Sequence, residues 1–421
     1  MSGTLPPEEG MRRSRICLLH PFDPRGSKVG GLETYIRDFI GFHPPDVDVL
    51  LIGVDGRGDL TLGETHWATF RGRTFEFLPI LHYPDERARE AARSVRESIT
   101  AQFFFALLRR FRAVARAIRS RRCSLDLRRV EYAWVPVALR RPFIQMLHGE
   151  GAPKLDMDSL LKKYRFVHNL GERFAMATSR KFLCVNPFIT ERLQQTYPRH
   201  RGKIDTLWTW ANTEIFRPQP MPDASDTFRI AFAGRLDEFK NPPLMFKTIA
   251  ALRRRLADKV EFHYIGTSDP KRFAEYAEIA PVTVAHGFKD AAGIAETLAG
   301  VHAGILTSNF EGMPRCVLET LAVGRPVVAT RLPQLDTVIH DRESGFIVPR
   351  NAPQDELAER LADRFIDLRV AILNKEIDPG AVARKVDPFT PRTQLARVFH
   401  FHREIQRSDA PPGMRAARTA H

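Results

Sequence analysis

The chain has 421 residues, of which 43% are hydrophobic and 10% aromatic, so it is long enough for two globular domains and too apolar for a disordered protein. Lysine and arginine outnumber aspartate and glutamate by 64 to 50, and the net charge of +14 favours an anionic partner: nucleic acid, an acidic membrane face or a phosphorylated substrate. The four cysteines, Cys17, Cys123, Cys184 and Cys316, are scattered, which argues against a disulfide framework and against a zinc site.

The sequence shows neither a secretion signal nor a membrane span. Its first ten residues contain Pro-Pro-Glu-Glu where a signal peptide needs basic and then apolar residues. No apolar run approaches the roughly eighteen residues that a spanning helix requires. We therefore expect a cytoplasmic protein, with a peripheral position on the inner membrane face as an open alternative.

Short apolar runs that end in Gly, Asn or Pro alternate with helical stretches along the chain. The predicted strands are Ile16–Leu19, Val49–Val54, Phe143–Leu147, Phe182–Val185, Arg229–Ala233, Val260–Ile265, Ala303–Thr307 and Val327–Ala329. They are rich in β-branched and aromatic residues and several lack alternation, which is typical of strands buried on both faces of a parallel sheet. The pattern predicts an α/β protein of doubly wound architecture.

A Pro-rich, polar stretch at residues 212–226 suits a linker between two domains. We therefore predict an N-terminal domain at 1–212 and a C-terminal domain at 213–390. A basic helix is predicted at 391–407. The first twelve residues and a tail at 408–421 are expected to be disordered.

Two segments of the N-terminal half follow predicted strands. Gly30 and Gly31 lie between the first strand and a helix, and His148 directly follows the strand Phe143–Leu147. Ligands of open α/β sheets bind beyond the carboxyl ends of the strands, so both segments are candidate binding elements. A lone Gly-Gly turn and a lone histidine are also common as purely structural features.

The stretch from 85 to 122 is strongly basic and amphipathic. Its apolar residues recur at a spacing of three and four, which predicts one face of a helix flanked by arginines. The residues on this face are Phe104, Leu107, Leu108, Phe111, Val114, Ala115 and Ile118. Two interpretations stay open: a surface helix that packs on the core, or an interfacial helix whose arginines at 86–122 attract anionic lipid.

The C-terminal half places charged residues at strand ends. Gly234, Arg235 and Lys240 follow the strand Arg229–Ala233. Glycine lets a ligand approach the backbone, and arginine and lysine suit phosphate. Phe288 follows another predicted strand, which ends at Gly287, and is either an exposed ligand contact or a core aromatic.

Residues 306–330 are the most informative segment. Glu311 and Glu319 are separated by seven residues, Gly312 and Pro314 open a helix, and Gly324 closes it. Met313 offers no oxygen to cap the first turn, so free amides at the positive helix end suit an anion. The alternative is an ordinary strand–loop–helix with two solvated glutamates.

These motifs resemble those of glycosyltransferase family four, the retaining glycosyltransferases with an E-x7-E signature. The resemblance covers roughly residues 15–400 and is specific at 229–349. It implies the GT-B fold, in which two Rossmann-like domains face a cleft. It also implies that the helix at 391–407 crosses back to the N-terminal domain.

The resemblance assigns roles to the C-terminal residues. Arg235 and Lys240 would hold the donor diphosphate, beside the close backbone at Gly234. Glu319 would accept hydrogen bonds from the ribose, and Phe288 would contact the base. The donor-side helix start consists of Gly312, Met313 and Pro314.

Three further roles also come from the resemblance. Glu311 and His148 would contact the transferred sugar, and we take them as the catalytic candidates. The Gly30–Gly31 loop would reach the donor phosphates or the acceptor.

The implied reaction moves a sugar from a nucleotide diphosphate sugar to a hydroxyl of a glycan or lipid-linked acceptor, with retention, in polysaccharide or glycolipid assembly. No cofactor and no essential metal are expected, because the basic residues and the helix dipole would neutralise the diphosphate. Two Asp-x-Asp strings, at 46–48 and 156–158, are therefore interpreted as non-metal segments.

The sequence departs from the family pattern in two places. The family's P-N-G-V-D segment appears as Trp208-Thr209-Trp210-Ala211-Asn212. The glycine pair after the last strand becomes Pro333-Gln334, and an acidic residue becomes Thr337. Contacts that the family's glycines make with phosphate or sugar therefore cannot be transferred to this chain.

Two other functions remain alternatives. A sugar-nucleotide epimerase of the same fold would share the nucleotide-binding half. A basic nucleic-acid-binding protein would fit the net charge, but the arginines gather on one helix without interleaved aromatic residues, so we expect no nucleic-acid partner.

Overall fold

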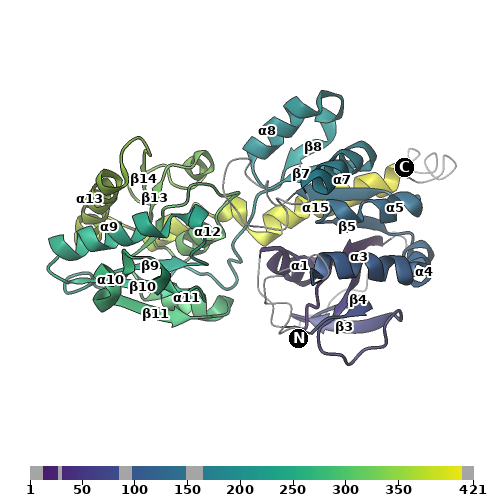
Figure 1. The fold of residues 1–421 in the computed structure, drawn as a ribbon, viewed down its shortest axis with the longest axis horizontal. Coiled ribbons are helices and arrows are strands. Elements are labelled where there is room, and N and C mark those ends of the chain that lie inside the picture. Colours follow the sequence, from purple (N-terminus) through teal and green to yellow (C-terminus); the bar gives the residue numbers. More distant parts are fainter. Residues whose placement is uncertain (1–12, 27–30, 85–96, 148–164, 410–421) are drawn as a thin grey trace, which may run out of the picture. The chain divides into compact units, whose positions relative to one another are not determined.

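The computed structural model describes residues 13–26, 31–84, 97–147 and 165–409. The chain forms two compact units (Figure 1). Unit 1 comprises Met1–Leu207 and Leu395–His421, and unit 2 comprises Trp208–Gln394. The division falls at Leu207/Trp208, whereas the Pro-rich stretch suggested 212/213, because residues 208–226 pack with the following domain.

Unit 1 is built on an eight-stranded sheet in the order β3-β4-β2-β1-β5-β6-β7-β8, parallel except for β3. Its strands are β1 (Ser14–Leu19), β2 (Val47–Asp55), β3 (His66–Phe70), β4 (Arg73–His82), β5 (Ser124–Leu127), β6 (Phe143–Leu147), β7 (Lys181–Cys184) and β8 (Ile204–Thr206). Every residue of β5 and β6 is buried, as expected for strands covered on both faces.

Helices surround this sheet. They are α1 (Gly31–Phe42), α3 (Ile99–Arg109), α4 (Phe111–Arg121), α5 (Trp134–Ala138), α7 (Arg165–Thr178), α8 (Pro187–Thr196) and α15 (Pro391–Ser408), with 3-10 turns η1 (Val130–Tyr132) and η2 (Pro198–Lys203). The last part of α15 packs on unit 1, where Phe399 meets Phe39 with ring centroids 4.8 Å apart. The helix extends to Ser408, where the tail was expected to begin, and residues 410–421 lie outside the described residues.

Unit 2 has a six-stranded, wholly parallel sheet in the order β11-β10-β9-β12-β13-β14. In chain order this is 3-2-1-4-5-6, the arrangement of a Rossmann fold. The strands are β9 (Phe228–Ala233), β10 (Val260–Ile265), β11 (Thr283–Gly287), β12 (Ala303–Leu306), β13 (Val327–Thr330) and β14 (Gly345–Val348).

The helices of unit 2 cover both faces of the sheet, and β12 and β13 are fully buried. They are α9 (Pro242–Arg255), α10 (Tyr276–Ile279), α11 (Ala291–Ala299), α12 (Arg315–Ala322), α13 (Gln354–Leu373) and α14 (Pro379–Arg384), with 3-10 turns η3 (Glu238–Lys240), η4 (Pro270–Arg272), η5 (Ala280–Val282), η6 (Pro333–Thr337) and η7 (Asp387–Phe389). Asn241 begins α9 by accepting a hydrogen bond from the Leu244 amide. Among the described residues, no helix combines the length and apolar character needed to cross a bilayer.

The predicted strands all exist, with boundaries shifted by up to two residues, but β3, β4, β5, β8 and β14 were not predicted. The β3–β4 hairpin turns through Arg71 and Gly72, which both have positive φ (49° and 73°), as a two-residue turn of the I′ type requires. An Arg-Gly pair is a weaker sequence signal for this turn than Asn-Gly, so the hairpin was missed.

The single amphipathic helix predicted within 85–122 is wrong. The described part forms two helices, α3 and α4, which meet at Arg110 with φ −105° and ψ 23°. The change of direction brings Phe103 and Leu107 into the core beside Val114 and Ile118, and it leaves Leu108 50% exposed. No proline or glycine marks this break, which is why the spacing alone predicted one continuous face.

Candidate functional site

The strand order of unit 2 reverses between β9 and β12, which makes the carboxyl ends of these two strands the topological switch point. Ligands of open α/β sheets bind at this place. The loops that leave the two strands carry Gly234–Asn241 and Thr307–Pro314, the segments that the sequence singled out. The fold therefore brings the predicted donor-binding residues of two distant segments together.

Gly234 begins the first of these loops with φ 152°, a backbone conformation that favours glycine. Its carbonyl oxygen lies only 2.3 Å from where a Cβ on Gly266 would stand, so the two loops after β9 and β10 are in close contact. The side chain of Arg235 is 74% exposed and pairs with Asp237 at 3.1 Å. This arginine is thus accessible to an anionic ligand.

Lys240 and Glu311 form the central contact of the site. Nζ of Lys240 donates to Oε1 of Glu311 at 2.6 Å, and both side chains are about 15% exposed (14% and 15%). The Ser308 hydroxyl donates to the same Oε1 at 3.1 Å. Burial acts to lower the pKa of Lys240, but the charge of the neighbouring Glu311 carboxylate and its hydrogen bond act to raise it. The net pKa is raised, so the ammonium stays charged.

Several hydrogen bonds hold the loop that carries Glu311. The Thr307 hydroxyl donates to the Lys240 carbonyl at 2.8 Å, and the Asn309 amide donates to the Phe239 carbonyl at 2.6 Å. The guanidinium of Arg350 donates to Asn309 Oδ1 at 2.6 Å. The sequence did not indicate Arg350, because a single arginine after a short strand carries no motif.

The helix start after this loop differs from the prediction by one position. Helix α12 begins at Arg315, so Pro314 is the N-cap residue and not the first helical residue, and no side chain caps the first turn. Met313 and Pro314 are buried, and Gly324 follows the helix with φ 83°. An N-terminus without a side-chain cap offers amides and a positive dipole end to an anion.

Glu319 lies in the middle of α12 and is partly buried. Cys316, one turn earlier, lies near enough to Lys240, Glu311 and Glu319 for their charges to influence its pKa. Burial raises the pKa of Cys316 to about 12, so its thiol is neutral near pH 7 and unsuited to act as a nucleophile.

Phe288 lies after the edge strand β11, and 61% of its surface is exposed. The alternative that it is a core aromatic is therefore wrong, because a core residue would be almost wholly buried. Its role as a base contact remains a prediction. Nearby, Lys289 donates to the Thr297 hydroxyl at 2.6 Å, and the Asp290 side chain caps α11.

The candidates of unit 1 are only partly described. Gly31 is the first residue of α1, is exposed, and has no atom within 4 Å of an added Cβ. Gly30 and His148 lie outside the described residues, as does the second Asp-x-Asp string, so their predicted roles stay untested.

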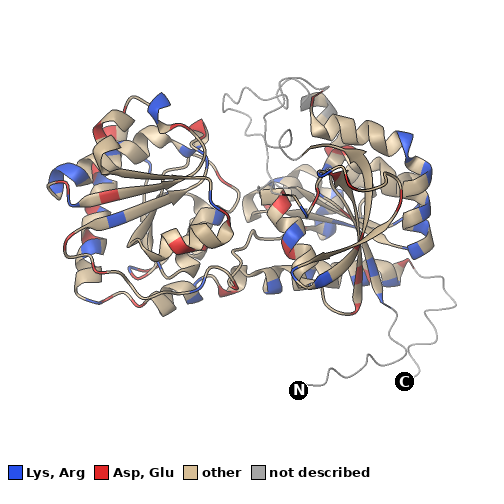
Figure 2. Ribbon diagram, turned by 90° about the horizontal axis from the view of Figure 1, so that it is seen from below, with Lys and Arg blue, Asp and Glu red and all other residues tan. Residues whose placement is uncertain are grey.

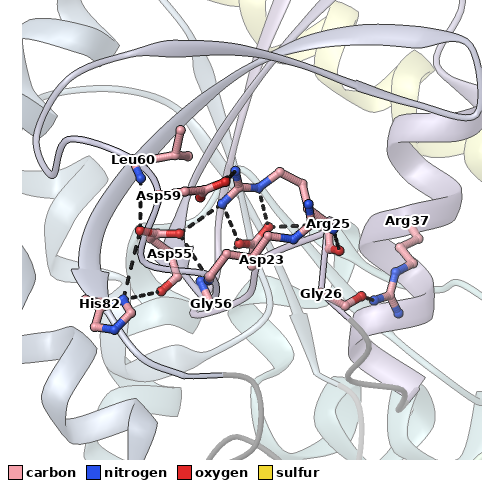
Figure 3. Close-up of polar contacts among 10 residues, drawn as sticks. Asp23, Arg25, Gly26, Arg37, Asp55, Gly56, Asp59, Leu60 and His82 are labelled. Atoms are coloured by element: carbon pink, nitrogen blue, oxygen red, sulfur yellow. Dashed lines mark hydrogen bonds and ion pairs between the residues drawn. The ribbon is translucent and has the colours of Figure 1, made fainter.

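A network of charged residues at the carboxyl ends of β1, β2 and β4 was missed by the sequence analysis (Figure 3). Nη2 of Arg25 lies 2.8 Å from Asp23 and 2.9 Å from Asp55, and Nη1 lies 2.9 Å from Asp59. Burial opposes the charge of Arg25, but its contacts with Asp23 and Asp59 outweigh burial and raise its pKa. The residues come from the loop after β1 and from the end of β2 with its following loop, so no local motif reveals them.

Asp46 and Asp48, the first Asp-x-Asp string, each pair with arginine. Asp46 lies 2.8 Å from Arg403 and Asp48 lies 3.3 Å from Arg13. Within the described ranges, no three His, Cys, Asp or Glu side chains are grouped as a metal ion would require.

Comparison with known proteins agrees with this geometry. Residues 227–367, which include β9 to β14 and the switch point, match a family model. The match is to glycosyl transferases group 1.

The D-inositol 3-phosphate glycosyltransferase of Paenarthrobacter aurescens is 25% identical over 213 residues, which cover 47% of this chain and 52% of that protein. That of Corynebacterium urealyticum is 27% identical over 215 residues, or 46% of this chain and 50% of that protein. The chain thus spans about half the length of these curated relatives.

Solved structures resemble the chain over nearly its whole length. Sucrose-phosphate synthase from Thermosynechococcus elongatus has a TM-score of 0.66 at 18% identity and covers 93% of this chain and 99% of its own. Anabaena HepE, solved with UDP and glucose, has a TM-score of 0.60 at 15% identity and covers 92% of this chain and 100% of its own. Two Rossmann-like α/β units of the GT-B type, the predicted fold class, are thereby confirmed.

Proposed function

We propose that this protein is a retaining glycosyltransferase of the family-four type. It moves a sugar from a nucleotide diphosphate sugar to a hydroxyl of a glycan or lipid-linked acceptor. The observation that carries the proposal is the Lys240–Glu311 pair at the switch point of unit 2, next to an α12 N-terminus without a side-chain cap. The group 1 match across this region supports it.

The chemistry follows from charge. When the anomeric C–O bond to the diphosphate breaks, positive charge develops on the sugar and negative charge on the departing diphosphate. Arg235, Lys240 and the first amides of α12 would stabilise the departing diphosphate, which is the usual dominant effect in such transfers. The acceptor oxygen then bonds to the anomeric carbon, and its proton passes to the diphosphate. The reaction as proposed needs no cofactor and no essential metal.

Nucleotide binding provides the first test. A thermal-shift panel would compare UDP, GDP and ADP, each with and without its sugar. A ligand at a hundred times its dissociation constant stabilises the fold by about 2.7 kcal/mol, which corresponds to several degrees. We expect one base to give this shift, and the absence of a shift with every nucleotide would overturn the proposal.

A matched pair of variants locates the binding site. Arg235→Ala should weaken nucleotide diphosphate binding by about ten- to a hundredfold, since a charge-assisted hydrogen bond contributes about 1.5–3 kcal/mol. Arg342→Ala is the control, because its side chain is also exposed (57%) but lies before β14, on the side of the amino ends of the strands. Equal affinities of the two variants would place the diphosphate elsewhere.

Product analysis separates transfer from epimerisation. Transfer liberates free nucleotide diphosphate in proportion to product, whereas an epimerase returns intact nucleotide sugar. Retention is tested by the anomeric coupling constant of the first product in nuclear magnetic resonance.

We also propose that α3 and α4 contact an anionic membrane surface, which would bring the enzyme to a lipid-linked acceptor on the inner membrane face. Arg109, Arg112, Arg116 and Arg119 are exposed on these helices (Lys and Arg are blue in Figure 2), while Leu107 and Val114 are buried in the core. Exposed Phe105 (66%) adds an apolar group to the same helix pair. Each basic residue near such a surface contributes about 1 kcal/mol.

A further inference from the structure

Residues 333–337 are one of the two places where the sequence departs from the family pattern, and they form the 3-10 turn η6. The side chain of Gln334 turns inward, so that the residue is only 3% exposed. Its Nε2 donates a hydrogen bond to the main-chain carbonyl of Glu311 at 2.9 Å. A buried side chain thus lies at the position where the family has glycine.

Thr337 supports the main chain of Gln334 through a second hydrogen bond. Its hydroxyl donates to the carbonyl of Gln334 at 2.7 Å, and the buried side chain of Leu335 anchors the turn between them. The departures at 334 and 337 are therefore linked by one hydrogen bond. Together they form a chain of contacts from Thr337 through Gln334 to Glu311.

Hydrogen bonds hold both the main chain and the side chain of Glu311. Gln334 fixes its main chain, while Lys240 and Ser308 fix the same carboxylate oxygen at 2.6 and 3.1 Å. A loop carboxylate held only by its side chain could rotate about the backbone. The contact from Gln334 removes that freedom, and small displacements of a group near the reacting atoms reduce turnover strongly.

We propose that Gln334, supported by Thr337, is a positioning residue that sets the place of the Glu311 carboxylate against the transferred sugar. This inference rests on the proposed function and deepens it. Where the family's glycines would offer backbone to the ligand, this chain uses a buried amide to orient the loop that carries Glu311. Gln334 itself need not touch the donor.

The test compares Gln334→Met with Gln354→Met. Methionine has nearly the length of glutamine but no N–H to donate. Gln354 also donates through Nε2, to Asn241 at 3.0 Å, but it is exposed and lies on α13. We expect Gln334→Met to lower kcat by about ten- to a hundredfold while its affinity for the nucleoside diphosphate stays within about twofold. The control should keep both values.

A second pair of variants, at Thr337, tests the same inference without changing Gln334. Thr337→Ser keeps the hydroxyl and should retain the wild-type kcat, whereas Thr337→Val removes it and should lower kcat in the same direction as Gln334→Met. This pair decides the inference if Gln334→Met does not fold.

The outcomes distinguish a failure of the proposed function from a failure of the positioning role of Gln334. If the wild-type protein neither binds a nucleotide nor releases nucleoside diphosphate, the proposed function itself fails. If the wild type is active but Gln334→Met matches the Gln354→Met control, the positioning role is wrong. An equal loss of nucleotide affinity and kcat would also overturn it, because that result indicates general loosening of the site.

Discussion

The ion pair between Lys240 and Glu311 joins two residues to which the resemblance gives different parts of the donor, diphosphate and sugar. In the free protein their side chains satisfy one another at 2.6 Å in a largely buried position. A diphosphate that approaches Lys240 must therefore share the ammonium with the Glu311 carboxylate. The Lys240–Glu311 contact therefore links the binding of the diphosphate to the binding of the sugar. No sequence motif indicates this contact.

This coupling predicts different effects for the two glutamates. Glu311→Gln removes the negative charge that competes for Lys240, so nucleoside diphosphate affinity should stay equal or rise while kcat falls. Glu319→Gln, on α12, should weaken nucleoside and nucleotide binding, because an amide is a poorer acceptor for ribose hydroxyls than a carboxylate. Calorimetric titration and steady-state kinetics measure both. Comparable losses of affinity in the two variants would show that the roles are assigned wrongly.

Among the elements of unit 1, the Arg25 network joins the loop after β1 to the loop after β2 (Figure 3). Asp23 also accepts from the Gly56 amide at 3.0 Å, and Asp55 accepts from the Leu60 amide at 3.2 Å. The two carboxylates, each with a side chain only 1% exposed, need the guanidinium as their counter-charge. The loop after β1 is thus fixed by charge in the stretch that leads to α1.

Arg25→Met should destabilise unit 1 by about 3 kcal/mol, because two buried carboxylates lose their partner. Arg57→Met is the matched control, since the Arg57 side chain is exposed and donates to the Arg25 carbonyl rather than to a carboxylate. This variant should cost less than about 1 kcal/mol. Hydrogen exchange of β1 and β2 peptides in urea reports the loss. Similar protection in both variants would mean that the network contributes little.

A buried histidine connects other elements in unit 2. His302 is 0% exposed, its Nδ1 accepts from the Arg229 amide at 2.8 Å, and its Nε2 donates to the Asp223 carbonyl at 2.9 Å. Burial lowers the pKa of His302 to about 4. The imidazole therefore joins the segment before β9 to β9 only while it is neutral.

Acidification should weaken unit 2 through this residue. Because its folded pKa lies below the ordinary value of about 6.5, the unfolded chain binds the proton first, and stability falls from about pH 6.5 toward pH 4. The wild type should lose about 2 kcal/mol between pH 7 and pH 5 from this group. His302→Gln should be less stable than the wild type at pH 7 and should lose less stability on acidification. The control is His340→Gln, at a half-exposed histidine (50%), whose stability should follow that of the wild type at both pH values. Hydrogen exchange of β9 peptides at both pH values measures this, and parallel pH curves of the two variants would exclude His302 as the cause.

At the scale of the whole molecule, the net charge of +14 predicts association with anionic surfaces. Arg112→Glu/Arg116→Glu should reduce sedimentation with anionic vesicles at low salt. Arg199→Glu/Arg201→Glu, the same charge change at exposed residues of η2, should reduce it less. Neutral vesicles and high salt should abolish binding of the wild type. An equal effect of the two charge reversals would leave total charge, not α4, as the determinant.

The sequence revealed those parts of the fold whose residues are close together along the chain. Buried strands such as β12 and β13, and the segment from Glu311 to Gly324, carry their signals within a few residues, and the structure has these elements where they were expected. The break at Arg110 and the Arg25 network depend on packing between distant segments, so local patterns could not predict them. The hydrogen bond between Gln334 and Glu311 joins residues that are 23 positions apart. The sequence indicated only that position 334 lacks the family's glycine.

The path of α15 determines how the protein can be divided into fragments. The helix begins in unit 2 and continues into unit 1, where His402 meets the Ser124 hydroxyl at 2.8 Å and Arg403 pairs with Asp46. Unit 2 is therefore an insertion within unit 1, and the backbone passes between them twice. A protease cut in the exposed stretch at 217–220 would leave unit 2 covalently attached to the C-terminal part of α15, which packs with the rest of unit 1. A fragment that stops at Leu207 would lack part of its own unit, whereas 208–394 is one continuous segment that can be cloned whole.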